Sequence, residues 1–349
     1  MNRCEAPFQQ GGTAVSAVIG RSVESCPNEN PLRAIRFAVV VCSNQRTPGA
    51  KRAIESVLSA CPKPDLIVIV DQAADATPDL LRVFDGLPGV IRIRDKGKGL
   101  SRARNIGTTA AEEAGATVVA YTDDDCTVEA DWLAGFASAF GMADDVALVF
   151  GTTKAAPHDT EEGTIPAYGV PRNTIHRGVV AKPDIEGMGA CMALRIDAWR
   201  WVGGFDERLG AGTPLASAEE NDLSLRLLCA GFAVAETPAS EVVHHGFRDR
   251  SAAPVLVAGY MRGSGAATAK MVRLGGAPAI LACAAIGKRW LSGRSGIKID
   301  HLPPRWIRLA SFLEGMIAGF KMEIDPATGR FLPFDSSHFI AGKASGETS

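Results

Sequence analysis

Cysteine pairs at metal-binding or redox spacing are missing from this sequence. Its eight cysteines are scattered along the chain, with no CxxC pair and no short disulfide-like spacing. Scattered thiols of this kind favour reduced cysteines over a secreted disulfide framework. The first 34 residues lack a continuous apolar block of signal-peptide length, and their Gly, Ser, Pro and Asn content predicts a flexible extension. We therefore expect a cytoplasmic protein.

Long apolar runs are also missing. The most apolar stretch, residues 275–287, falls well short of the roughly 20 residues that a membrane-spanning helix needs, so a buried helix explains it better. Basic residues flank the stretch closely enough to support a second hypothesis, a peripheral contact with an anionic membrane surface at the inner face. These residues are Lys270, Arg273, Lys288, Arg289 and Arg294.

A large excess of charge of one sign is absent as well. The formal net charge is −2 at pH 7, so bulk electrostatics give no support for nucleic-acid binding. Apolar residues make up 46% of the chain and charged residues 22%, as in an ordinary folded protein. A length of 349 residues fits one large or two moderate domains.

What the sequence does have, from residue 36 onward, is an alternation of short β-rich runs with helical segments, which is typical of a mostly parallel sheet covered by helices. We predict strands at 37–42, 66–70, 90–93 and 117–121, and helices at 50–60, 78–84, 101–114 and 129–140. Ser101 suits an N-cap and Pro78 a first helical turn. After about residue 150 loops dominate; ordered structure is expected again at 187–195, in helices at 197–202 and 218–230, and in two or three helices between 252 and 320.

Three consecutive acids, Asp123, Asp124 and Asp125, follow the apolar run 116–122. Like charges this close raise one another's pKa unless a cation or a donor-rich ligand neutralises them. The hard cations Mg²⁺ and Mn²⁺ prefer oxygen ligands and often share them with substrate phosphates. The triplet therefore favours a phosphate-bearing substrate held through a metal, with a solvated acidic turn as the structural alternative.

Two more polar strand ends, Ser43 and Asp71, are expected at the same edge, where ligands of open α/β sheets bind. Asp71 could accept hydrogen bonds from a nucleotide or could merely begin the next loop. The segment KGKGLSRARN surrounds flexible glycines with basic residues at a helix N-terminus, which predicts either a phosphate site or a solvated basic face. Its basic residues are Lys96, Lys98, Arg102 and Arg104.

Acidic residues also stand at the N-terminus of the helix predicted at 218–230. Glu219, Glu220 and Asp222 would be stabilised there by the helix dipole without any function, although such a carboxylate could also take a proton from an attacking hydroxyl. His244 follows a β-like run, and a neutral imidazole can ligate a metal or serve a purely structural role.

The order of these segments along the chain resembles that of the family 2 glycosyltransferases of GT-A fold. The matching segments cover residues 36 to about 248 and read VVVCSNQR, LIVIVDQAAD, GLSRARNIG, VAYTDDDC, GMGACMALR, VGGFDERLGAG, AEENDLSLRLLCAG and VVHHG. The resemblance implies an α/β, Rossmann-like domain with a mostly parallel sheet flanked by helices. We accordingly expect a flexible extension at 1–34, a GT-A domain at 35–250, a helical extension at 251–340 and a disordered tail at 341–349.

The resemblance also implies a nucleoside-diphosphate sugar donor bound with Mg²⁺ or Mn²⁺. Asp123 and Asp125 match the DxD pair that holds the ribose and the metal, and His244 matches a histidine that helps to bind the metal in some relatives. Further candidates for nucleotide-sugar contact are Ser43, Arg46, Asp71, Lys98, Arg102, Arg104 and Asp124.

The family's catalytic Asp is replaced here, because its ED pair reads Glu219-Glu220. The resemblance makes Glu220 the general base, with Glu219 as a substitute, in a single displacement that inverts the anomeric carbon. Glycine-rich loops at 187–192 and 203–214 would line the acceptor and diphosphate side; their candidate residues are Gly189, Gly203, Gly204 and Asp206. Trp199, Trp201 and Phe205 could stack on a sugar or anchor the core.

Two alternative functions stay open at this point. A sugar nucleotidyltransferase would carry a more glycine-rich loop than CSNQRTPGAK after its first strand. A non-catalytic nucleotide-sugar-binding or scaffold protein of the same fold is suggested by the Glu-for-Asp change. The acceptor could be a saccharide, a lipid-linked intermediate or a small molecule, and the C-terminal helices could form an acceptor lid, a homodimer surface or a membrane-facing platform.

Overall fold

The structure, a computed structural model, describes residues 35–274, 277–292 and 296–332. The extension expected at 1–34 and the tail expected at 341–349 lie outside these residues. The described part of the chain holds a mixed sheet of nine strands in the order β3-β2-β1-β4-β9-β6-β10-β5, with β8 paired to β10. The strands are β1 (Phe37–Ser43), β2 (Leu66–Asp71), β3 (Val90–Arg94), β4 (Val118–Asp123), β5 (Cys126–Val128), β6 (Val146–Ala155), β8 (Thr174–His176), β9 (Met192–Arg195) and β10 (Ala233–His244).

The longest strand pairings in this sheet are parallel. Strands β3, β2, β1 and β4 run parallel to one another, and so do β6 and β10. The short strand β9 joins the two groups by pairing antiparallel with both β4 and β6. A separate two-stranded sheet pairs β7 (Gly163–Thr164) with β11 (Arg248–Asp249). The mostly parallel α/β sheet predicted from the sequence is confirmed.

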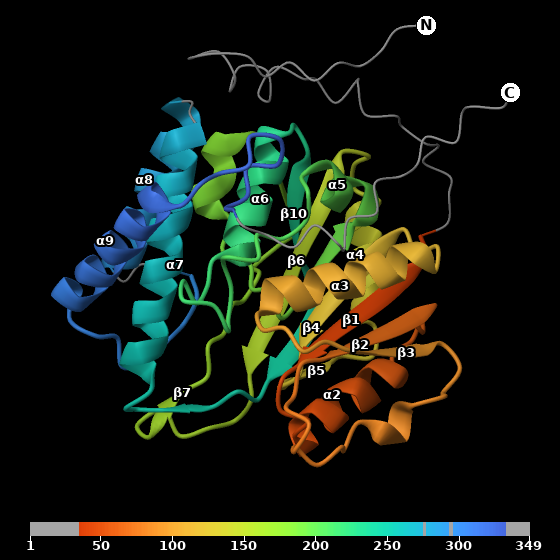
Figure 1. The fold of residues 1–349 in the computed structure, drawn as a ribbon. Helices are drawn as coiled ribbons and strands as arrows, with labels where there is room; N and C mark the ends of the chain where they lie inside the picture. The colour runs from red at the N-terminus through yellow and green to blue at the C-terminus, as the bar shows by residue number, and fades with distance from the viewer. Residues whose placement is uncertain (1–34, 275–276, 293–295, 333–349) are drawn as a thin grey trace, which may run out of the picture.

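Helices cover both faces of the sheet (Figure 1). On one face, α2 (Pro48–Leu58) and α4 (Trp132–Phe140) pack on odd-numbered side chains of β1 such as Val39. On the other face, α3 (Leu100–Glu113), α5 (Ile196–Trp201) and α6 (Glu219–Cys229) pack on even-numbered ones such as Val40. The alternation follows from the two-residue period of a strand, and burial on both faces explains why β1 reads as a continuous apolar run.

Three helices follow the sheet: α7 (Ala253–Leu274), α8 (Ala277–Ser292) and α9 (Arg305–Lys321). They lie together at the side of the sheet away from β3 (Figure 1). No helix among the described residues has both the length and the apolar character to span a bilayer. The presence of α7, α8 and α9 confirms the prediction of two or three helices in this region.

Two local predictions are wrong. The helix expected at 78–84 is reduced to a 3-10 turn, η2 (Arg82–Phe84), because Asp79 turns back to pair with Arg92 at 2.7 Å. Ser101 is not an N-cap: Gly99, with φ 111°, occupies that position. Ser101 lies inside the first turn, where its buried hydroxyl donates to the carbonyl of Leu209 at 2.7 Å.

Candidate active site

A cavity of about 220 Å³ opens at the carboxyl end of β4. Its walls come from the β4–β5 turn, the segment before β9, the start of α6, the end of β10 and one side of α7. Seven of the candidate residues line it, although they are far apart in the sequence: Arg104, Asp123, Asp125, Gly189, Glu219, Glu220 and His244. The fold therefore gathers the acids of two separate motifs into one space.

The acidic triplet is accommodated because its three side chains have different partners. Asp123 accepts from the Arg104 guanidinium at 3.2 Å. Asp124 lies against the β1 end: burial raises the pKa of Asp124 to about 6, although a Ser43 hydrogen bond opposes the shift. Asp125 faces His244, with 3.4 Å between Oδ1 and Nε2. Separate partners reduce the repulsion that three adjacent carboxylates would otherwise suffer.

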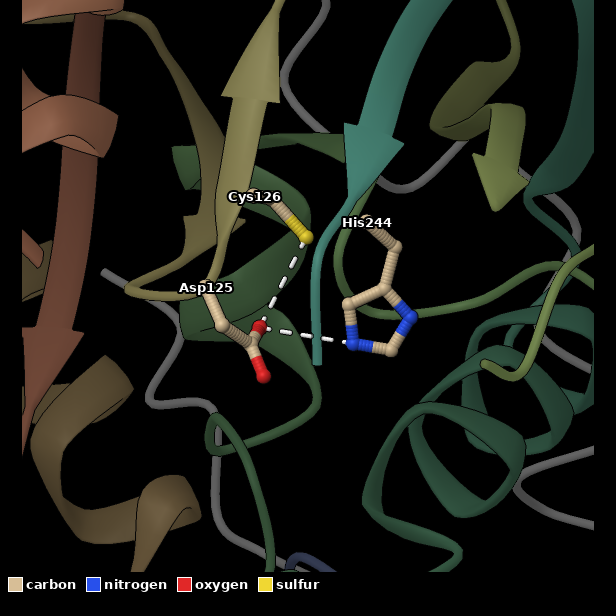
Figure 2. Close-up of side chains that lie close together, drawn as sticks. All are labelled: Asp125, Cys126 and His244. Atoms are coloured by element: carbon tan, nitrogen blue, oxygen red, sulfur yellow. Dashed lines mark hydrogen bonds and ion pairs between the residues drawn. The ribbon is translucent and has the colours of Figure 1, made fainter. Parts of the chain in front are cut away.

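Asp125, Cys126 and His244 form the one group among the described residues whose ligand atoms are close enough to hold a metal ion. All three side chains point toward one another (Figure 2). The Nδ1 atom of His244 lies 2.9 Å from the carbonyl oxygen of Pro166, which fits Nδ1 as the donor and leaves Nε2 facing the carboxylate. Burial acts to raise the pKa of Asp125, but the His244 hydrogen bond together with the nearby His244 and Arg248 charges holds that pKa below its usual value.

Cys126 is the weakest candidate ligand in this group. Its side chain is buried, and burial raises the pKa of its thiol well above the usual value. A protonated thiol is a poor ligand, and Mg²⁺ or Mn²⁺ prefers oxygen. Asp123 is not part of the group, and its carboxylate pairs with Arg104.

Arg104, on α3, joins the two acidic motifs. Its guanidinium, 2% exposed, reaches Asp123 with one nitrogen and Glu219 with another, at 3.2 and 3.0 Å. It also lies over the rings of Tyr121 and Phe205. A side chain held on so many sides fixes the relative positions of the β4 end and the α6 start.

The two glutamates at the start of α6 differ in their surroundings. Glu219 is buried and engaged by Arg104, whereas Glu220 is half-buried on the cavity wall. Burial and then the neighbouring Glu219 raise the pKa of Glu220 to about 8. A carboxylate with a raised pKa in a cavity is suited to accept a proton.

Comparison with known proteins bears on the family and the fold of this chain. Residues 38–198 match the sequence profile described as Glycosyl transferase family 2. This match places residues 38–198 in glycosyltransferase family 2. A glucosyl-dolichyl phosphate glucuronosyltransferase of Haloferax volcanii is 32% identical over 124 residues, 34% of this chain; the match spans only 38% of the length of that relative.

Solved structures share the fold. S. aureus TarS aligns with a TM-score of 0.56 at 13% identity, covering 81% of each chain. A mannosyltransferase of Pyrobaculum calidifontis, solved in complex with GDP-Man and Mn²⁺, aligns with a TM-score of 0.54 at 16% identity, covering 90% of this chain and 85% of that one. Both similarities support the GT-A fold of the family 2 domain.

Asp71 is enclosed rather than open in this family 2 domain. Its carboxylate is fully buried and accepts from the guanidinium groups of Arg46, Arg92 and Arg94 and from the backbone of Ala73. Arg92 and Arg94 come from β3, and Asp71 pairs with Arg94 in the parallel register. The predicted nucleotide contact of Asp71 stays a prediction, and its visible role is to hold three arginines at the sheet edge.

Several other candidates lie outside the cavity wall. Lys98 precedes α3, and Arg102, in the first turn of α3, pairs with Asp95 at 3.1 Å. Gly203, Gly204 and Asp206 are buried, and Asp206 binds Lys270 at 2.6 Å instead of facing the cavity. The remaining candidates outside the wall are Ser43, Arg46, Asp71 and Asp124.

The aromatic candidates do not line the cavity. Trp199 and Phe205 are buried in the core between the sheet and α3, so their core-anchor reading is the correct one, while Trp201 is exposed outside the cavity. Two cavity residues that the sequence did not single out are Arg248, 3.8 Å from Asp125, and Tyr260 on α7. Both lie at or beyond the end of the segments that resemble family 2, and no sequence motif marks either residue.

Proposed function

We propose that this protein transfers a sugar from a nucleoside-diphosphate sugar to an acceptor hydroxyl. The observation that supports the proposal is the shared cavity, whose wall contains Asp125 and His244 as well as Glu219 and Glu220. A carboxylate–imidazole pair suits a divalent cation, and a half-buried carboxylate suits proton abstraction. The acceptor, whether saccharide, lipid-linked intermediate or small molecule, would enter beside Glu220.

The residues present fit Mg²⁺ or Mn²⁺. Asp125 offers an oxygen and His244 a nitrogen, and the Pro166 carbonyl orients the imidazole. When bound there, the cation would screen the charge that develops on the departing diphosphate. Asp123, held by Arg104, would face the donor from the other side of the turn.

Glu220 would act as the general base. Its carboxylate accepts the proton of the acceptor hydroxyl as the hydroxyl oxygen forms a bond to the anomeric carbon. The bond from that carbon to the nucleoside diphosphate breaks in the same step, and a single displacement of this kind inverts the anomeric carbon. Glu219 stays bound to Arg104 and keeps the loop before α6 in place.

Substitution of the proposed base tests this function. Glu220→Gln should lower kcat, measured as nucleoside diphosphate release, by about 10²- to 10⁴-fold. The affinity for the donor, measured by calorimetry, should stay unchanged. The same change at Glu55, an exposed residue of α2, is the matched control and should have no effect. Unchanged turnover of Glu220→Gln would remove Glu220 as the base, and pyrophosphate release from a sugar 1-phosphate and a nucleoside triphosphate would favour the nucleotidyltransferase alternative.

A further inference from the structure

An apolar stripe lies along the outer face of α9. It consists of Trp306, Leu309, Leu313, Ile317 and Phe320, whose exposed fractions are 70, 44, 47, 56 and 47%. The spacing of three or four residues keeps all five on one face of the helix. Five large apolar side chains exposed in one row indicate a surface that binds something.

The opposite face of α9 is fixed against α7, so the stripe cannot turn inward. A Cβ at Gly315 would lie 1.9 Å from the carbonyl oxygen of Arg262, and one at Gly319 would lie 2.7 Å from that of Ala266. The two helix backbones therefore touch through glycines, and Phe312 is buried between them. Rotation of α9 to hide the stripe would break this packing.

Positive charge is concentrated in the same region. Residues 253–321 contain ten Lys or Arg and two Asp or Glu. Lys270 is buried and paired with Asp206 and Asp222, which leaves nine basic residues against the two acids. The single acid of α9, Glu314, lies 3.1 Å from Arg262. Exposed Arg305 and Lys321 stand at the two ends of the stripe. An apolar row with cations at its ends suits the boundary between anionic headgroups and acyl chains.

The size of the stripe argues against a second protein copy as its occupant. A helix of 17 residues is about 25 Å long and, at a width of about 10 Å, offers on the order of 250 Å². A stable protein interface needs about 800 Å² from each partner. A lipid surface has no such minimum, since each inserted side chain contributes by itself.

We propose that α9 docks the protein on an anionic lipid bilayer through this stripe. The proposal deepens the proposed function, because α7, which is packed against α9, also lines the cavity through Leu256, Tyr260 and Ser264. Docking through α9 would hold the cavity near the bilayer and favour a lipid-linked acceptor.

Vesicle flotation of the full chain tests the proposal and needs no catalysis. Wild type should float with phosphatidylglycerol vesicles, more weakly at high salt, and not with phosphatidylcholine vesicles. The variant Trp306→Gln/Leu313→Gln/Ile317→Gln should bind at least about tenfold more weakly. The matched control carries Leu80→Gln, Val83→Gln and Leu87→Gln, which are also exposed but lie near the opposite edge of the sheet, and should bind like wild type.

The charge-reversal variant Arg305→Glu/Lys321→Glu gives a second test if the apolar variant fails to fold, and it should lose binding to the anionic vesicles. Equal flotation of wild type and both α9 variants would overturn the proposal, as would absence of wild-type flotation. A wild-type dimer by light scattering that the α9 variants dissociate, without vesicle binding, would identify a second copy as the occupant. Sugar transfer to a soluble acceptor should be unaffected in the α9 variants, so failure of docking and failure of the proposed function are distinguishable.

Discussion

At the scale of single residues, the chemistry of this protein depends on how buried charges are shared. Three adjacent aspartates are tolerated because each contacts a different partner: Arg104, the end of β1 or His244. The same arginine engages Glu219, whereas Glu220 lies half-buried on the cavity wall. One buried cation thus separates a positioning acid from a proposed base.

The raised pKa of Glu220 predicts the pH dependence of turnover. A base must be deprotonated, and burial with the nearby Glu219 raises the pKa of Glu220 to about 8. We expect kcat to rise about tenfold per pH unit below that value and to level off above it. Initial rates between pH 6 and 9 check this expectation. A flat profile over that range would contradict the assignment, and the residual activity of Glu220→Gln should not follow the same curve.

Gly189 supports the Arg104 contacts by leaving room for them. A Cβ at Gly189 would lie 2.6 and 2.8 Å from the two terminal guanidinium nitrogens. We expect Gly189→Ala to displace Arg104, to lower kcat, and to lower the free energy of unfolding by about 1–3 kcal/mol. Turnover assays and urea denaturation measure both effects. Gly169→Ala is the control, because nothing lies within 4 Å of that Cβ; equal turnover in the two variants would refute the argument.

At the scale of elements, the sequence predicted the first four strands, missed β6 and most of β10, and failed where distant segments meet. Apolar runs predicted β1 to β4 to within about two residues, because their burial on both faces leaves a clear signal. The helix expected at 78–84 failed because Asp79 pairs with Arg92 of β3, a contact that no local pattern records.

The candidate active site was also predicted only in part: residues next to regular elements were found, and residues placed by tertiary contacts were not. The acids of the β4–β5 turn and of the α6 start were predicted, since each follows or begins a regular element. The enclosure of Asp71 was not predicted, although the alternation of Arg92 and Arg94 in β3 could have suggested that both point to one face. Tyr260 and Arg248 could not have been found, because their place in the cavity comes from tertiary packing alone.

The start of α6 is held in a costly backbone conformation. Ala218, its N-cap, has φ 74° and ψ 15°, and Ala216 also has a positive φ, 66°. A left-handed alanine costs roughly 1–2 kcal/mol relative to an ordinary conformation. We expect Ala216→Gly, which relieves this cost at a half-buried position, to raise the free energy of unfolding by about 1 kcal/mol. Chemical denaturation checks the gain; a loss of stability would show that the methyl group of Ala216 packs more favourably than assumed.

At the scale of the whole molecule, a buried charge network ties α7 to the sheet domain. Lys270 of α7 lies 2.6 Å from Asp206 and 2.5 Å from Asp222, and all three side chains are fully buried. Arg226 binds the other oxygen of Asp222 at 2.8 Å. The network fixes the helix that lines the cavity and carries α9.

Removal of the central cation should therefore destabilise the fold. Lys270→Met leaves Asp206 buried without a cationic partner, and we expect a loss of about 3–5 kcal/mol in the free energy of unfolding, measured by urea denaturation. Lys51→Met, which removes an exposed pair with Glu55, should change stability by less than about 1 kcal/mol. Similar denaturation midpoints for the two variants would contradict the role given to the network.

The most direct measurement is calorimetry of nucleotide-sugar binding with Mn²⁺ and with a chelator, using UDP and GDP sugars. If Asp125 and His244 hold the cation, wild type should bind its donor at least about tenfold more tightly with Mn²⁺. Asp125→Ala and His244→Ala should remove that difference, whereas His245→Ala, whose imidazole contacts Thr127 instead, should keep it. Equal donor affinity of the wild type in Mn²⁺ and in chelator would contradict the account.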